Sequence, residues 1–298
     1  MLRHISLEHG LSMPVELIGQ GEPVVLLHGF GMDARSWIPF VWPYRRQFQF
    51  ILPHLRGFGR SARLPMPEAD FLGVYVRDLV QLRRQLGLQR YRLGGISMGA
   101  SAALALHAAG EFAGVSHYLH IDQSPVIHNQ PDWPWGSFGT RQAGLFARFA
   151  EDLSELTRHA HLPYAHLPEP LRRKLHALRA EFQAETATAP LHQQLARQLP
   201  RLFHWLDRLD QPGWASQIRI MQGYLQQGYD FRPSLPRLTV PTTVMIGQHS
   251  RVYDLEGQQA LVYLLPQAQA VLFPRAGHLI PIEQPIAFTR ELGRWLQR

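Results

Sequence analysis

Short apolar runs alternate with segments of helical periodicity along most of this chain, and no other feature constrains its fold as strongly. In the first part of the chain we expect strands at residues 15–18, 24–27, 50–52, 91–93 and 117–121. Apolar residues at helical spacing lie between the last three of these strands, at residues 71–86 and 98–109. The same order returns near the end, with expected strands at 242–246 and 270–273 and helices at 258–265 and 286–296. This alternation predicts the α/β class, with a mostly parallel central sheet and helices on both faces.

The segment between these two parts has a different pattern of apolar residues and prolines. Strand-like runs are missing from residues 124–233, where prolines separate helical stretches. A helical segment cannot continue a sheet, so we expect an all-helical cap at 124–233. The core then consists of residues 1–123 and 234–298, and a chain of 298 residues suits one large core with such an insert.

Composition excludes several classes of protein. The chain has no cysteine, which excludes disulfide scaffolds, cysteine zinc sites and thiol nucleophiles. The net charge of +7 comes from scattered arginines rather than one basic stripe, so we expect no nucleic-acid partner. The longest apolar runs are far too short to cross a bilayer, which predicts no stable membrane insertion. The polar start of the chain shows no secretory signal, and we expect a cytoplasmic protein.

A candidate nucleophile lies in Gly95-Ile96-Ser97-Met98-Gly99. This pentapeptide follows the expected strand at 91–93 and opens a helix of small residues. A strand, a tight turn and a helix form the context in which G-x-S-x-G exposes a serine hydroxyl at the carboxyl edge of a sheet. The pattern therefore predicts that Ser97 is a catalytic nucleophile.

A glycine-rich loop, His28-Gly29-Phe30-Gly31, follows the expected strand at 24–27. We expect the peptide N–H groups of Phe30 and Met98 to form an oxyanion hole above Ser97. The ring of His28 is expected to support the loop rather than to move protons. We place His28 and Gly29 at the substrate pocket.

The candidate general base is His278, in Arg275-Ala276-Gly277-His278. It follows the expected strand at 270–273 and precedes the last helix, which puts it on a short loop at the sheet edge. The histidines of the insert, at 159, 161, 166, 176, 192 and 204, lie on arginine-rich helical stretches, where they are expected to be solvated. His278 also follows the serine in chain order, as in the serine, acid, histidine order of nucleophile-elbow hydrolases.

With the segment 55–61 (Leu-Arg-Gly-Phe-Gly-Arg-Ser), these motifs occur in an order that resembles the α/β-hydrolase-fold superfamily of serine hydrolases with a helical cap. The resemblance covers nearly all of the chain outside the insert. It implies a Ser-His-acid triad, and Ser97 argues against the branches that carry an aspartate nucleophile. Two departures stand out: His54 replaces a common aspartate, and Ser250 replaces the usual acid three residues after Gly247.

Three carboxylates are candidates for the displaced acid. Asp122 ends the expected strand at 117–121, and some branches of the superfamily carry their acid there. Asp254 lies four residues after Ser250, where we expect it to cap a helix. Glu283 resembles a structural glutamate of the family. We favour Asp122 as the triad acid, with Asp254 as the alternative and a triad without an acid as the third.

These residues predict an esterase-like serine hydrolase that acts on a small or medium hydrophobic ester or lactone through an acyl-enzyme. Two alternatives remain: a hydrolase of carbon–carbon bonds or amides with the same triad, and a non-catalytic binding protein of this fold. No metal site or cofactor is expected, since neither H-E-x-x-H nor an early G-x-G-x-x-G is present. We expect Trp133 and Trp135 to line the substrate pocket, whereas Phe138, Phe146 and Phe149 suit either the pocket or the core of the cap. The sequence does not indicate an oligomeric state.

Overall fold

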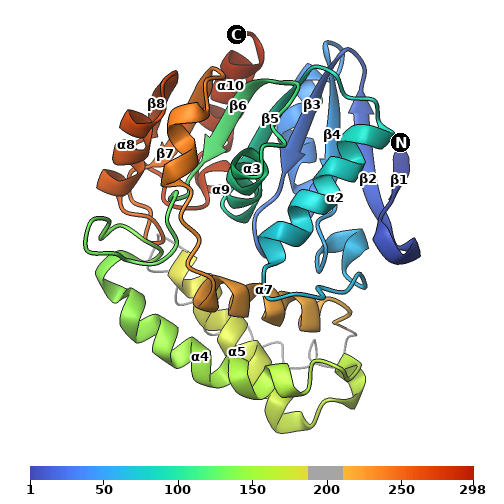
Figure 1. The fold of residues 1–298 in the computed structure, drawn as a ribbon, viewed down its shortest axis with the longest axis vertical. Coiled ribbons are helices and arrows are strands. Elements are labelled where there is room, and N and C mark those ends of the chain that lie inside the picture. Colours follow the sequence, from blue (N-terminus) through green and yellow to red (C-terminus); the bar gives the residue numbers. More distant parts are fainter. Residues whose placement is uncertain (187–210) are drawn as a thin grey trace.

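The computed structural model describes residues 1–186 and 211–298, and within them eight strands form one sheet (Figure 1). The strands are β1 (Leu2–Ser6), β2 (Ser12–Gly19), β3 (Glu22–Leu27), β4 (Phe48–Pro53), β5 (Tyr91–Ile96), β6 (Val115–Ile121), β7 (Thr242–Gly247) and β8 (Ala268–Phe273). Their order in the sheet is β1-β2-β4-β3-β5-β6-β7-β8. The pairs β1/β2 and β2/β4 are antiparallel, and all other neighbours are parallel. The mostly parallel sheet predicted from the sequence is confirmed.

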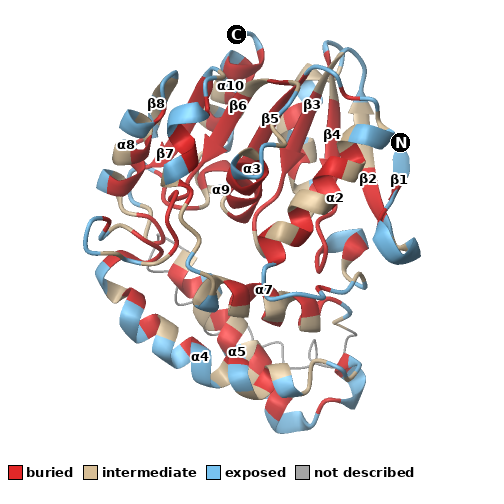
Figure 2. Ribbon diagram, viewed as in Figure 1, coloured by how far each residue is buried: buried red, intermediate tan, exposed pale blue. Residues whose placement is uncertain are grey.

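Helices cover both faces of this sheet. They are α1 (Ile38–Val41), α2 (Phe71–Gln85), α3 (Met98–Ala108), α8 (Leu255–Leu264), α9 (Ile280–Glu283) and α10 (Pro285–Leu296). One buried cluster joins α2, α3 and α8 to the sheet, and a second joins α1, α9 and α10 to the opposite face (Figure 2). In β3, Val25 and Leu27 belong to the first cluster, whereas Val24 and Leu26 belong to the second. This is why the strand reads as a continuous apolar run: side chains alternate between two faces that are both buried.

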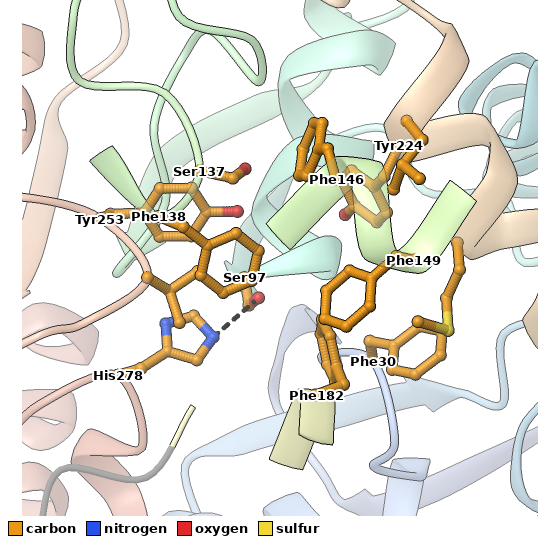
Figure 3. Close-up of a pocket in the computed structure, with 13 residues that line it drawn as sticks. Phe30, Ser97, Ser137, Phe138, Phe146, Phe149, Phe182, Tyr224, Tyr253 and His278 are labelled. Carbon is orange, nitrogen blue, oxygen red and sulfur yellow. Dashed lines mark hydrogen bonds between the residues drawn. The ribbon is translucent and has the colours of Figure 1, made fainter. Parts of the chain in front are cut away.

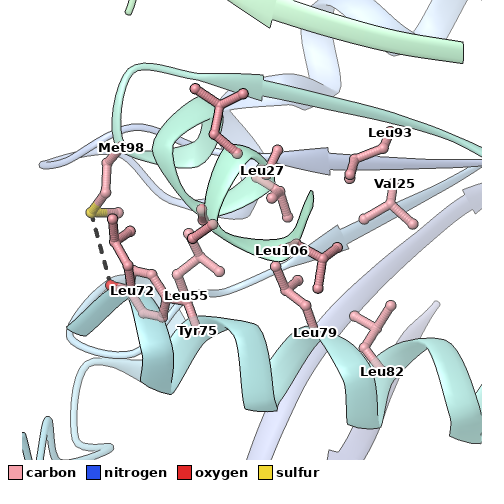
Figure 4. Close-up of a cluster of buried hydrophobic side chains, with 14 of the residues drawn as sticks. Val25, Leu27, Leu55, Leu72, Tyr75, Leu79, Leu82, Leu93, Met98 and Leu106 are labelled. Atoms are coloured by element: carbon pink, nitrogen blue, oxygen red, sulfur yellow. Dashed lines mark hydrogen bonds between the residues drawn. The ribbon is translucent and has the colours of Figure 1, made fainter. Parts of the chain in front are cut away.

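Helix α2 packs against the sheet through apolar residues at helical spacing. It begins after Asp70, whose side chain accepts a hydrogen bond from the N–H of Gly73 at 3.0 Å. Its apolar stripe faces β3, β5 and α3 (Figure 4). On the same helix, Asp78 forms a buried, bidentate ion pair with Arg56 of the 55–61 segment, at 2.7 and 2.8 Å. The pair attaches this loop to the core.

The segment between β6 and β7 carries the helices α4 (Gln142–Arg158), α5 (Glu169–Thr186) and α7 (Trp214–Gln226). Its described residues contain two isolated β-bridges and no strand. One bridge, Val126 to Asp230, joins the beginning of the segment to its end. The three helices share an apolar cluster of their own and lie across one end of the sheet (Figure 1). Residues 187–210 of the expected cap lie outside the described residues.

The seven runs expected to be strands lie within β2 to β8. The sequence analysis missed β1, an edge strand in which only Ile5 is buried. A strand with one buried side chain has little apolar alternation to detect.

Candidate active site

The candidate catalytic residues follow neighbouring strands of the sheet. Ser97 follows β5, Asp122 follows β6 and His278 lies beyond β8, and these strands belong to the continuous order β5-β6-β7-β8. Beyond the strand ends, the Ser97 N–H donates to the carbonyl of Ile121 at 2.9 Å, and the Asp122 N–H donates to the carbonyl of Met245 at 3.0 Å. Backbone hydrogen bonds therefore hold the serine and the aspartate side by side at the carboxyl edge of the sheet.

Ser97 has the backbone conformation of a tight elbow, with φ 51° and ψ −119°. A left-handed φ is unfavourable for a residue with a side chain, so it persists where the surroundings enforce it. The two flanking glycines are required by close packing. A Cβ on Gly95 would lie 2.4 Å from the backbone of Gly99, and one on Gly99 would lie 2.3 Å from the carbonyl oxygen of Leu27.

A chain of hydrogen bonds connects the three side chains. His278 Nε2 lies 3.0 Å from Ser97 Oγ (Figure 3). On the other side of the ring, His278 Nδ1 lies 2.7 Å from Asp122 Oδ2. Asp122 is completely buried and His278 nearly so. With Nδ1–H donating to the carboxylate, Nε2 of a neutral imidazole is left to accept the proton of the serine hydroxyl. The arrangement is suited to activating Ser97 as a nucleophile.

Three further donors hold the Asp122 carboxylate. Oδ1 accepts from the N–H of Gly247 at 2.9 Å and from Nε2 of Gln258 at 3.1 Å. Oδ2, the oxygen that faces His278, also accepts from Ser250 Oγ at 2.7 Å. Ser250 stands at the position where the resemblance implies an acid. Its hydroxyl instead donates a hydrogen bond to Asp122, a carboxylate that follows the neighbouring strand.

Asp254 differs from the sequence-based expectation. It directly precedes α8, but its side chain makes no capping hydrogen bond, so the expected capping role is wrong. His278 Nδ1 pairs with Asp122, and the described contacts of Asp254 do not include His278. Burial raises the pKa of the Asp254 carboxyl.

The expected oxyanion loop lies beside the elbow. Within the described residues, the N–H groups of Phe30 and Met98 donate no hydrogen bond, so both remain able to bind an oxyanion. His28 is fully buried; its Nδ1 contacts the carbonyl of Gly29 at 2.9 Å, and its Nε2 accepts from the N–H of Leu55 at 3.1 Å. Burial lowers the pKa of His28 to about 4, so it is neutral at pH 7.

His28 therefore supports the loop, as expected, but its placement at the substrate pocket is wrong. Its ring uses both nitrogens on backbone groups and lines neither cavity at Ser97. Gly29 does border one of these cavities.

A cavity lined mainly by aromatic side chains, the aromatic cavity, opens beside Ser97 and has a volume of about 50 Å³ (Figure 3). Its lining residues are Phe30, Ser97, Ser137, Phe138, Phe146, Phe149, Phe182, Met221, Tyr224, Leu225, Val252, Tyr253 and His278. Burial raises the pKa of both Tyr224 and Tyr253, which keeps their hydroxyls neutral. The cavity is suited to an apolar group of a substrate.

The expectation that Trp133 and Trp135 line the substrate pocket is wrong. Trp133 is buried, its Nε1 donates to Ser124 Oγ at 3.1 Å, and its ring lies 5.5 Å from the guanidinium of Arg232. Trp135 packs edge-to-face on Trp133 and lies close to Gly257 of α8. The two rings pack where the two ends of the insert meet.

Phenylalanines of the insert line the aromatic cavity instead, and they also pack in the apolar cluster of the insert. They are Phe138, Phe146 and Phe149. Sequence analysis did not single out Phe182, Tyr224 or Tyr253, which also line it. No local pattern distinguishes these rings from ordinary core residues, because their role depends on the packing of separate segments.

A larger cavity, the wide cavity, lies on the side of the expected oxyanion loop and has a volume of about 720 Å³. Phe30, Ser97, Phe182, Met221 and His278 border both cavities. A substrate carbonyl bound at Ser97 therefore has room for one substituent in each cavity.

Two other residues singled out from the sequence have structural contacts. His54 is buried, and its Nδ1 accepts from the N–H of Arg60 at 3.3 Å, which ties down the 55–61 segment. Glu283 accepts a hydrogen bond from the N–H of Gly277, next to His278. Both support loops that border the site.

In residues 1–186 and 211–298, no group of three or more histidine, aspartate or glutamate side chains is placed to bind a metal ion. None of the helices in this part of the chain combines the length and the hydropathy needed to span a bilayer.

Comparison with known proteins identifies the family. Residues 22–285 match the alpha/beta hydrolase fold family. A pimeloyl-[acyl-carrier protein] methyl ester esterase from Legionella pneumophila (strain Corby) is 26% identical over 269 residues, which is 90% of this chain and 92% of the relative. The AB hydrolase superfamily protein YisY from Bacillus subtilis (strain 168) is 25% identical over 93% of this chain and 92% of its own. The structure of an esterase from Exiguobacterium antarcticum covers all of both chains, with a TM-score of 0.72 and 23% identity. This protein therefore belongs to the alpha/beta hydrolase fold family.

Proposed function

We propose that this protein is a serine hydrolase that cleaves small or medium hydrophobic carboxylic esters or lactones through an acyl-enzyme. The observation that carries the proposal is the chain of hydrogen bonds from Ser97 through His278 to Asp122, at 3.0 and 2.7 Å. The relatives support ester hydrolysis, since several with 24 to 27% identity are methyl ester esterases.

In the proposed reaction, Ser97 Oγ attacks the ester carbonyl while His278 Nε2 takes the hydroxyl proton. The N–H groups of Phe30 and Met98 stabilise the oxyanion of the tetrahedral intermediate. The C–O bond then breaks, and His278 returns its proton to the leaving alcohol. Water attacks the acyl-enzyme in the same way and releases the acid and the free serine. No step requires a metal ion or an organic cofactor.

The aromatic cavity is the proposed binding site for the acyl group, because its lining is almost entirely apolar and it opens directly at Ser97. The alternative of a non-catalytic binding protein rested on the absence of an acid at Ser250. Asp122 reaches His278 from the neighbouring strand, and this removes the main reason for that alternative.

The proposal is tested with a fluorophosphonate probe, which labels activated serines, and with p-nitrophenyl esters. We expect the purified protein to be labelled and to hydrolyse p-nitrophenyl butyrate. Ser97→Ala should abolish both, because no other hydroxyl is activated by His278, while circular dichroism shows an unchanged fold. Absence of labelling at every pH would contradict the proposal, as would more than a few per cent of activity in folded Ser97→Ala.

A further inference from the structure

One face of α5 borders the wide cavity. Arg179, Phe182, Gln183 and Thr186 all line it, at the spacing i, i+3, i+4, i+7 of a single helical face. Across the cavity lie the oxyanion loop and the 55–61 segment, with Ser97 and His278 also in the lining. A substrate in this cavity therefore contacts α5 on one side and the catalytic groups on the other.

The guanidinium of Arg179 is held in place by neutral groups. Its Nη1 donates to Gln211 Oε1 at 3.1 Å, and its Nη2 donates to Gln217 Oε1 at 2.7 Å. Gln217 is fixed in turn, because its Nε2 donates to the carbonyl of Gly57 at 2.8 Å. Within the described ranges, no carboxylate forms an ion pair with Arg179. In this part of the chain, the cation is therefore held by two neutral amides and by no carboxylate.

The pKa values of the described arginines agree with this geometry. Carboxylates raise the pKa of Arg35, Arg56 and Arg232, whereas desolvation lowers the pKa of Arg179 to about 10. Arg179 still carries its charge at pH 7, in surroundings that disfavour an unpaired charge. A bound anion would remove this penalty.

The carboxylate of Asp33, which also borders the wide cavity, does not serve as that anion. It accepts hydrogen bonds from the N–H and from Nη2 of Arg35, at 2.7 and 2.9 Å, and these contacts hold its pKa below the usual range. The charge of Asp33 is already compensated by Arg35, so among the described residues that line this cavity Arg179 is a cation without a carboxylate partner.

We infer that the wide cavity binds an ester whose leaving alcohol carries an anionic group, a carboxylate or a phosphate, which pairs with Arg179. The inference rests on the proposed function. It assigns the acyl group to the aromatic cavity and the alcohol to the wide cavity, since both cavities meet at Ser97. The amides of Gln211 and Gln217 orient the guanidinium toward this group.

Matched esters of one acid provide the test. We compare p-nitrophenyl butyrate with its analogue that carries a carboxylate on the nitrophenol, and glycerol monobutyrate with butyryl glycerol phosphate. Arg179→Gln should lower kcat/KM for at least one of the two anionic esters about tenfold or more, while the matched neutral ester changes less than about twofold. The pair that responds identifies the anion as carboxylate or phosphate.

Two variants complete the kinetic test. Arg179→Lys should retain part of the preference, because it keeps the charge. Arg173→Gln, an exposed position on the same helix that pairs with Glu169, should behave as wild type. Equal losses for neutral and anionic esters in Arg179→Gln would overturn the inference. So would a selective loss for monomethyl succinate, whose charge lies on the acyl side.

Binding separates this inference from the proposed function. The carboxylate-bearing butyrate ester and butyryl glycerol phosphate are titrated calorimetrically into Ser97→Ala and into Ser97→Ala/Arg179→Gln. At least tenfold weaker binding of one of them by the double variant supports the inference even if no ester is hydrolysed. Equal binding of both esters by the two variants overturns it even if wild type is an active esterase.

Discussion

Ser97 and Asp122 both have a positive φ, at 51° and 44°, which few of the described residues other than glycine share. In each case, the N–H directly after a strand donates to the neighbouring strand, and this contact fixes the strained conformation. Asp122 is then held by Gly247, Gln258 and Ser250, so its carboxylate is fixed before substrate arrives. In the proposed triad, such a preorganised acid keeps His278 in the tautomer that accepts the serine proton.

The first prediction concerns this acid. Asp122→Asn should lower kcat at least about a hundredfold, because the amide cannot stabilise the imidazolium; in a chymotrypsin-type triad the same change costs about 10⁴. Ser250→Ala should lower kcat by about tenfold, since it removes one charge-assisted hydrogen bond from Asp122 Oδ2. Ester hydrolysis by folded variants measures both.

The same site allows a rescue experiment. Ser250 Oγ and His278 Nδ1 contact the same oxygen of Asp122, so a carboxylate at position 250 lies near the histidine. Ser250→Asp in the Asp122→Asn background should restore part of the activity. Asp254→Asn is the matched control and should remain active, since Asp254 does not pair with His278. Loss of turnover in folded Asp254→Asn, or full activity of Asp122→Asn, would contradict this assignment.

At the scale of elements, the insert supplies eight of the thirteen residues that line the aromatic cavity, while the core supplies the candidate catalytic residues. Helix α4 buries Leu145, Phe149 and Leu153 at helical spacing, and Phe146, next to this stripe, faces the aromatic cavity. The loop with Trp133 and Trp135 instead packs where the two ends of the insert meet. Helical periodicity indicates that α4 has a buried face, but the orientation of the whole helix decides which rings approach Ser97.

The second prediction compares these two elements. Phe146→Ala should reduce kcat/KM more for longer p-nitrophenyl esters than for the acetate, by up to about fourfold for each methylene that loses its contact, which corresponds to about 0.8 kcal/mol. Trp135→Ala should show no dependence on chain length. A chain-length effect in Trp135→Ala and none in Phe146→Ala would place the acyl group elsewhere.

At the scale of the whole molecule, buried histidines couple stability to pH. His28 and His120 are completely buried, and burial lowers the pKa of each to about 4. The folded protein keeps both neutral, whereas the unfolded chain takes up protons once the pH falls below about 6.5. The unfolded state then binds more protons, so the free energy of unfolding falls between about pH 6.5 and pH 4.

The third prediction concerns this loss of unfolding free energy at low pH. At pH 5, each of the two histidines should lower the free energy of unfolding by about 2 kcal/mol relative to pH 7.5. Urea unfolding of His28→Gln should therefore show a smaller loss between these pH values, by about 2 kcal/mol. His161→Gln, at an exposed position of the insert, is the control and should match wild type. The same pH dependence in His28→Gln and wild type would show that His28 is not the cause.

The sequence by itself predicted the α/β class, the strands β2 to β8, and Ser97 and His278 as candidate nucleophile and base, because these depend on local periodicity and on short motifs at strand ends. Only the tertiary structure brings Asp122 into contact with His278 and places the rings that line the aromatic cavity. Asp122 meets His278 across 156 residues of chain, and Ser250 and Gln258 reach it across 128 and 136. Likewise, Phe182 and Tyr224 line the pocket and Trp133 does not, because this depends on how α4, α5 and α7 pack over the sheet edge. Side chains that meet only after separate segments have packed leave no periodic trace in the sequence.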